Sequence, residues 1–220
     1  MAEATFKQAG RSVDYTPTAN VAIGEVVTKS DLVGIATKAI TANVPGTIDV
    51  EGVFDVVKTS ALAIAVGDEV YFNPVTREAN KTAGVRASGT LTFTGVGVAD
   101  QIVTIGNRVY TWKVAPAAAD EVAIGANQAA SEANLTAAIN SGVGGSAPHT
   151  QVTAADVAST VVVTAIEYGT APNAYATTED GTNMSWGAAT LEGGAGGPKM
   201  GKAIKAAANP SSLVRVKLSQ

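Results

Sequence analysis

The fold of this chain is indicated most clearly by residues 47–57, which read TIDVEGVFDVV. Apolar residues occupy one side of an extended chain, and polar or acidic residues occupy most of the other side. The apolar positions are Ile48, Val50, Phe54 and Val56, with Gly52 between them. Alternation with a period of two is typical of a β-strand with one buried face. Pro45 and Gly46 supply a turn before it, so the sequence predicts a strand over 47–57.

Further short strands are predicted on both sides of this stretch, separated by Gly, Pro, Asn and Asp. They are residues 4–8, 12–16, 25–28, 32–37 and 69–73. Their spacing is typical of small barrels and sandwiches. The sequence therefore predicts a mainly β protein, with a small β-barrel or β-tulip-like frame whose first part is residues 1–87.

The C-terminal residues 195–220 are predicted to complete the same frame. Residues 201–207, a turn at 209–212 and residues 213–218 read as a β-hairpin. The Gly-rich stretch 193–198 precedes this hairpin and is a natural hinge.

Charge separates the middle of the chain from its ends. Residues 87–195 carry two basic and nine acidic residues, a net charge of −7, whereas the remainder carries +3. Blocks of different charge favour separate modules, although a chance distribution over one surface stays open. We predict an inserted module at 88–194.

The inserted module is predicted to be α+β, an antiparallel sheet with one helix against it. The strand-like stretches are 90–94, 102–105, 108–112 and 159–166. Asn127 can cap a helix that Gly142 ends, with Leu135, Ala138 and Ile139 on its apolar side. The strands beginning at 89 and 189 are expected to pair, because an inserted module must start and finish at neighbouring points.

Composition argues against an enzyme. The chain has one histidine and no cysteine among 220 residues, so the usual nucleophile and base pairs and thiolate metal sites are missing. No catalytic, cofactor-binding or metal-binding residues are expected. Only 15% of residues are charged, which suits lasting contact with neighbours. Neither a signal peptide nor an apolar membrane span is indicated, and we expect a soluble protein.

Several segments resemble a family of phage capsid cement, or head decoration, proteins. They are 13–21 (VDYTPTANV), 24–27 (GEVV), 50–56 (VEGVFDV), 67–71 (GDEVY) and 214–218 (VRVKL). The insertion resembles a module that recurs in phage structural proteins, through 104–106 (TIG), 110–112 (YTW), 134–139 (NLTAAI) and 185–186 (SW). The family usually runs without interruption from the frame strands to the C-terminal hairpin, so the insertion departs from its pattern.

Members of that family have sometimes been labelled RecA/RadA-like phage recombinases, and residues 196–203 (GGPKMGKA) test that label. They fit the G-x-x-x-x-G-K part of a phosphate-binding loop. Ala203, however, stands where Ser or Thr would hold Mg²⁺, and Asn209-Pro210 leaves little room for the helix such a loop requires. We expect no nucleotide binding.

Other candidate sites have simpler interpretations. His149 has no second His or Cys with which to share a metal, and is expected in a loop or at the surface. Residues 179–183 (EDGTN) offer oxygen ligands but lack the spacing of a calcium loop, which favours a turn. Trp112 and Trp186 could line a sugar-binding surface, although large aromatic residues in strands are usually core.

The resemblance implies a capsid decoration protein on the outer surface of the virion, which binds the mature phage head and stabilises it against internal DNA pressure. The expected partners are the major capsid protein and further copies in a homotrimer, with no nucleic acid and no membrane. Candidate capsid-binding residues are Phe6, Lys7 and Arg11. The alternative is a virion-surface adhesion module that binds host carbohydrate through Trp112, Tyr168, Tyr175 or Trp186.

Overall fold

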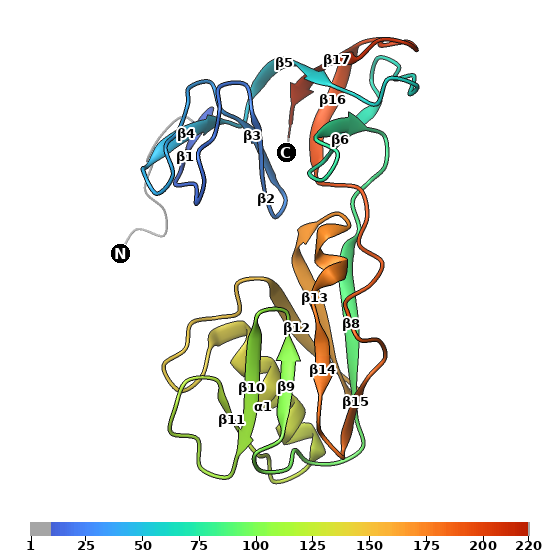
Figure 1. Cartoon of the computed structure of the whole chain (residues 1–220). Coiled ribbons are helices and arrows are strands. Elements are labelled where there is room, and N and C mark those ends of the chain that lie inside the picture. Colours follow the sequence, from blue (N-terminus) through green and yellow to red (C-terminus); the bar gives the residue numbers. More distant parts are fainter. Residues whose placement is uncertain (1–9, 220) are drawn as a thin grey trace, which may run out of the picture. The chain divides into compact units, whose positions relative to one another are not determined.

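The computed structural model describes residues 10–219, which form two compact units (Figure 1). We call Met1–Gly84 with Gly196–Gln220 the frame unit and Val85–Ala195 the central unit. Strands dominate both units, so the predicted mainly β class is confirmed. The predicted strand at 4–8 lies outside the described residues.

The frame unit begins with a four-stranded antiparallel sheet in the order β1-β4-β3-β2. Its strands are β1 (Ser12–Tyr15), β2 (Val26–Lys29), β3 (Leu32–Ile35) and β4 (Gly46–Asp49). Among the described residues β1 pairs only with β4, with Ser12 opposite Asp49, so β1 lies at the edge of this sheet.

A second sheet in the frame unit has five antiparallel strands in the order β5-β17-β16-β6-β7. Its strands are β5 (Gly52–Val57), β6 (Glu69–Asn73), β7 (Glu78–Asn80), β16 (Lys199–Lys205) and β17 (Leu213–Leu218). The predicted C-terminal hairpin is thereby confirmed as β16 and β17, which insert between two strands from the first part of the chain.

The core of the frame unit lies between these sheets. In β17 Val214, Val216 and Leu218 are buried and alternate with exposed residues. They pack in one cluster with Val33 and Ile35 of the first sheet. The period-two pattern of the sequence thus places one face of each strand in the core and leaves the other to solvent.

Two expectations for the frame are wrong. The strand expected over 47–57 is two strands in different sheets, because the chain turns after Asp49 and Gly52 takes a φ of +137°. The barrel is not formed within residues 10–219. Only one bridge, between Lys58 and Ala79, joins the edges of the five-stranded sheet, because β7 has three residues and cannot provide a continuous ladder.

The central unit has two four-stranded sheets rather than the single sheet expected. One is ordered β12-β13-β8-β15 and the other β11-β10-β9-β14, and only the β10–β11 pair is parallel. The strands are β8 (Arg86–Phe93), β9 (Ile102–Ile105), β10 (Arg108–Lys113), β11 (Glu121–Ala123), β12 (Val152–Val157), β13 (Thr160–Tyr168), β14 (Thr177–Glu179) and β15 (Met184–Trp186). Residues from both sheets share one core cluster.

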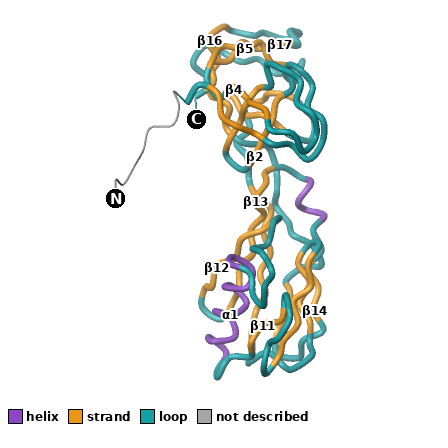
Figure 2. Tube along the Cα trace, turned by 90° about the vertical axis from the view of Figure 1, so that its left-hand side faces the viewer, coloured by secondary structure: helices purple, strands orange, loops and turns teal. Residues whose placement is uncertain are grey.

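The single α-helix of residues 10–219, α1 (Gln128–Ser141), matches its prediction closely. The Asn127 side chain accepts a hydrogen bond from the Ala130 amide at 2.9 Å, and Gly142 follows the helix with a φ of +78°. Leu135, Ala138 and Ile139 are buried, and α1 packs against β11 and β12 (Figure 2). A short 3-10 turn, η1 (Ala171–Ala174), precedes β14.

The chain enters and leaves the central unit at neighbouring points. Val85 forms an antiparallel bridge with Ala195, and Ser88 forms another with Glu192. The expected pairing of residues 89–91 with 189–191 is not formed: β8 pairs there with β15, and Thr190 bridges to Ala176 instead.

Candidate functional site

Of the three predicted binding residues, the structure describes only Arg11. Phe6 and Lys7 fall outside the described residues. Arg11 is exposed and immediately precedes β1, and its carbonyl accepts a hydrogen bond from the Val50 amide at 3.0 Å. The hydrogen bond extends the β1–β4 ladder by one pair and leaves the Arg11 side chain in solvent at the edge of the sheet.

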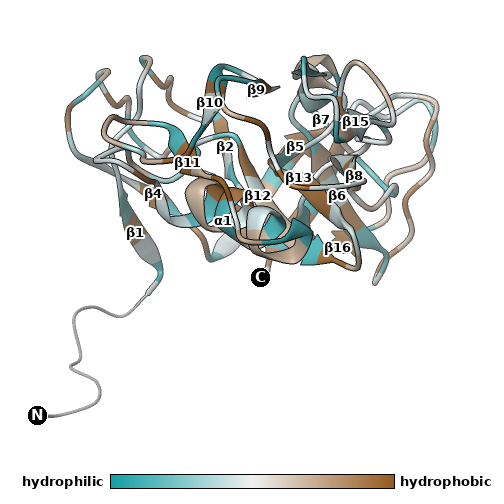
Figure 3. Cartoon of the chain, turned by 90° about the horizontal axis from the view of Figure 1, so that it is seen from below, coloured by the Kyte–Doolittle hydropathy of each residue, from teal (hydrophilic) through white to brown (hydrophobic). Residues whose placement is uncertain are grey.

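The solvent-facing side of the five-stranded sheet carries a group of cations that sequence reasoning did not identify. We call it the basic face; its cations are Lys199, Lys202, Lys205, Arg215 and Lys217, all exposed. Along β16 the exposed Lys199, Lys202 and Lys205 are separated by the buried Met200, Gly201 and Ala203 and by Ile204, and Figure 3 colours the chain by hydropathy. The alternation in residues 213–218 and the hairpin with residues 201–207 were predicted from the sequence, but the pairing of β17 with β5 and of β16 with β6 was not.

Two carboxylates belong to this face. Arg215 makes a bidentate contact with Asp55, with Nε donating to Oδ1 at 2.8 Å and Nη2 to Oδ2 at 2.7 Å. Lys199 donates to Glu69 at 2.6 Å. The hydrogen bond from Arg215 holds the pKa of Asp55 below its usual value, and that from Lys199 does the same for Glu69. Both carboxylates therefore stay ionised at neutral pH, and the face carries five positive and two negative groups.

Aliphatic side chains lie among these charges. Val53, Val57, Ile204 and Leu213 are each between 43% and 52% exposed. Val57 lies directly opposite Leu213 in the β5–β17 ladder, and Val53 lies opposite Lys217. The face is therefore mixed, apolar and basic, which is a composition found in protein interfaces.

The stretch resembling a phosphate-binding loop is a β-strand. Lys202 lies within β16, where it pairs with Lys217 of β17 and Glu69 of β6. A phosphate-binding loop needs its lysine at a helix N-terminus, where backbone amides converge on the anion. The backbone here is a β-strand and lacks that geometry.

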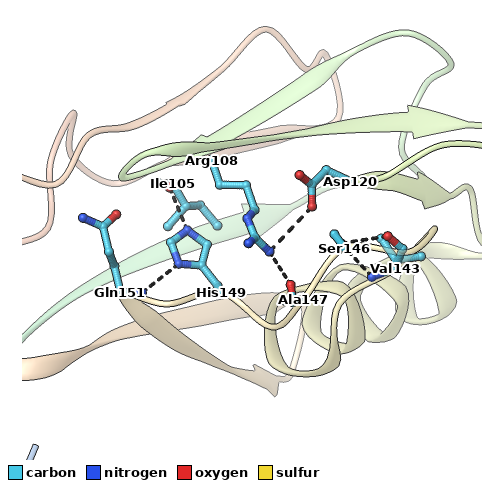
Figure 4. Close-up of polar contacts among 8 residues, drawn as sticks. All are labelled: Ile105, Arg108, Asp120, Val143, Ser146, Ala147, His149 and Gln151. Atoms are coloured by element: carbon cyan, nitrogen blue, oxygen red, sulfur yellow. Dashed lines mark hydrogen bonds and ion pairs between the residues drawn. The ribbon is translucent and has the colours of Figure 1, made fainter. Parts of the chain in front are cut away.

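His149 lies in a loop, as expected, but it is buried rather than at the surface (Figure 4). Its Nε2 is 2.9 Å from the Ile105 carbonyl, and its Nδ1 accepts a hydrogen bond from the Gln151 amide at 3.1 Å. This pair of contacts requires the neutral ring with the proton on Nε2. Arg108 beside it donates to the Ala147 carbonyl at 2.6 Å and lies 3.6 Å from Asp120.

Burial lowers the pKa of His149, and this predicts a pH dependence for the central unit. Below about pH 6.5 the unfolded chain protonates this ring more readily than the folded chain does. The free energy of unfolding should therefore fall as the pH drops from 7.5 to 5.5, and the loss should be smaller in His149→Gln. Both tryptophans, Trp112 and Trp186, lie in the central unit, so tryptophan fluorescence during urea unfolding of the full chain measures it. If the free energy of unfolding depends equally on pH in the unmodified protein and in His149→Gln, His149 is not the group responsible.

The remaining candidates are structural. Residues 180–183 form the expected turn between β14 and β15, and Asp180 accepts a hydrogen bond from the Ile102 amide at 2.6 Å. Across residues 10–219 no acidic or histidine cluster suited to a metal is present. Over the same residues, no helix has the length and apolar character required to cross a bilayer.

The aromatic residues proposed for carbohydrate stacking are not gathered on an open surface. Trp112 is 1% exposed and belongs to the core, as large strand aromatics usually do. Tyr175 and Trp186 are half-buried against the same core. Tyr168 is half-buried beneath the Arg86 guanidinium, which lies 4.6 Å from the ring centre.

One comparison with known proteins matches the N-terminal part of the chain. Residues 7–101 match the phage cement protein family. The predicted resemblance to the capsid cement family is thereby confirmed. The match spans β1 to β7 and extends through β8 of the central unit. No curated protein and no solved structure matches the chain. Phage cement proteins are structural, so the match indicates a bacteriophage capsid component.

Proposed function

We propose that this protein is a capsid decoration protein that binds the outer surface of the mature phage head and stabilises it against the pressure of packaged DNA. The cement family match over residues 7–101 carries this proposal. It is supported by the frame unit, which presents an edge strand and a mixed basic face and holds no catalytic arrangement among its described residues. The protein acts by binding and catalyses no reaction.

Stabilisation of this kind depends on the same contacts being repeated many times over the shell. A single interface yields little net free energy, because lost translational freedom and ordering of side chains offset much of the apolar burial. When a protein contacts more than one shell subunit, the subunits can separate only if their contacts with that protein are broken as well. Binding as a homotrimer, which the family resemblance implies, multiplies the contacts at each position.

We assign the two units different roles. The frame unit binds the shell, with Phe6, Lys7 and Arg11 among the contacts. Residues 88–194 form an inserted module that projects from the head. The central unit carries three basic and nine acidic residues, a net charge of −6. Like charges on neighbouring heads repel one another, and this charge would oppose association between heads.

Binding can be measured by adding the purified protein to heads of the parent phage that lack it, and then sedimenting the heads. We expect the full chain to sediment with the heads, and a variant without residues 2–10 to stay in the supernatant with its circular dichroism spectrum unchanged. Equal binding by this variant would remove Phe6 and Lys7 from the interface. Absence of binding by the full chain would contradict the proposed function.

A further inference from the structure

We propose that the basic face docks on an acidic protein surface of the phage shell. The inference rests on the proposed function and adds the surface of this chain and the chemistry of the partner. The partner surface would carry Asp or Glu side chains opposite the lysines, with apolar groups between them.

The pairing of the strands places cations directly opposite one another. Lys202 lies opposite Lys217 between β16 and β17, and Lys205 lies opposite Arg215 two pairs further along the same ladder, beyond Ala203 and Val216. Like charges in directly opposed positions destabilise a sheet. A carboxylate lies on the other side of each pair, Glu69 opposite Lys202 and Asp55 opposite Arg215, and offsets part of the repulsion. An acidic partner would relieve the remaining repulsion on binding.

These cations are only partly neutralised within the chain. Asp55 pairs with Arg215, and Glu69 pairs with Lys199. Among the described residues no carboxylate forms an ion pair with Lys202, Lys205 or Lys217. The face therefore carries five cations and two carboxylates, a net charge of +3, and the three lysines without an ion pair all lie on the two C-terminal strands.

The apolar residues of the face favour a protein over a nucleic acid. Val57 and Leu213 form an exposed pair next to the cations, and Ile204 adds to them from β16. A hollow of about 200 Å³ lies beside this pair, lined in part by Lys205, Leu213 and Arg215. A sugar-phosphate backbone would leave the aliphatic side chains in water, and Asp55 and Glu69 would repel it. A protein surface can bury the apolar groups and pair with the cations together.

The test separates binding from folding, because Lys217→Glu should weaken binding to heads without lowering the stability of the free protein. Lys217→Glu places a carboxylate opposite Lys202, so the repulsive pair becomes attractive and the thermal midpoint of the free protein should not fall. The same change reverses a charge that faces the acidic partner. We expect binding to heads lacking this protein to weaken roughly tenfold or more. Lys202→Glu should weaken binding in the same way, but it places its carboxylate opposite Glu69 of β6 as well as opposite Lys217, so no gain in stability is expected from it.

The control is Lys38→Glu, which makes the same charge change at an exposed lysine outside the basic face. It should bind heads as the unmodified protein does. Binding of the unmodified protein should also weaken as NaCl rises from 50 to 300 mM, since exposed charges are screened over about 10 Å at 0.1 M salt.

The outcomes distinguish the two proposals. If the unmodified protein does not bind heads, the proposed function fails. If it binds and both Lys217→Glu and Lys202→Glu bind equally well, the function stands and the basic face is overturned as the docking surface. Duplex DNA binding at 150 mM NaCl that both substitutions abolish would also overturn the inference, because it would assign the face to nucleic acid.

Discussion

Replacement of Trp112 by alanine is expected to lower the free energy of unfolding of the central unit by about 3–5 kcal/mol. Trp112 is 1% exposed, and its ring packs edge-on against Phe93 with centroids 6.2 Å apart. Alanine would leave a cavity where strands from both sheets meet in one core. Because small domains are commonly stable by only 5–15 kcal/mol, the loss would remove much of the stability of this unit.

The measurement is urea unfolding of the full chain followed by the fluorescence of Trp186, the tryptophan that remains in the central unit. Trp112→Phe keeps an aromatic ring and serves as the control, with a smaller expected loss. The proposed division of roles adds a second expectation. At a temperature where the central unit is still folded, Trp112→Ala should bind heads normally. A loss of stability below 1 kcal/mol would show that Trp112 is not central to this core.

Lys58→Met is expected to destabilise the frame unit by about 2–3 kcal/mol. Lys58 is 1% exposed, although lysine is rarely buried without a partner. Its Nζ donates to the carbonyls of Thr59 at 3.0 Å, Ser60 at 3.2 Å and Leu62 at 2.6 Å. The ammonium group thus holds the loop after β5 in place. Methionine has a similar length but no donor, so these carbonyls would lose their partner.

Hydrogen exchange measured by mass spectrometry tests this substitution, because the frame unit contains no tryptophan. Amides of β5 and of β7, which the Lys58–Ala79 bridge connects, should exchange faster in Lys58→Met. Amides of the central unit should be unchanged. Lys38→Met is the control, because it replaces an exposed lysine in the same way, and it should leave the hydrogen-exchange rates of these amides unchanged. Unchanged protection of β5 and β7 in Lys58→Met would contradict a structural role for this lysine.

Features encoded by neighbouring residues could be predicted from the sequence. The helix was recognised from its cap at Asn127, its apolar positions and Gly142, all within one short segment. The C-terminal hairpin was recognised from alternation and turn residues in the same way. These signals act through local backbone geometry, so no knowledge of distant contacts is needed.

Features that depend on distant segments could not be predicted. The break at Gly52 separates β4 from β5 because each strand finds partners in a different sheet, and the sequence around it reads as one continuous strand. His149 is buried because Ile105, 44 residues away, accepts a hydrogen bond from it. The opposed cations of the basic face arise from the register of β16 on β17, which includes a bulge between Ala203 and Lys205.

The central claim is that this protein strengthens a phage head by binding to its shell. It is tested most directly by heating DNA-filled heads that lack the protein, with and without the purified full chain, and following DNA release with an intercalating dye. The account predicts that the chain raises the temperature of DNA release, and that Lys217→Glu at the same concentration raises it less. Release at the same temperature with and without saturating protein would contradict it.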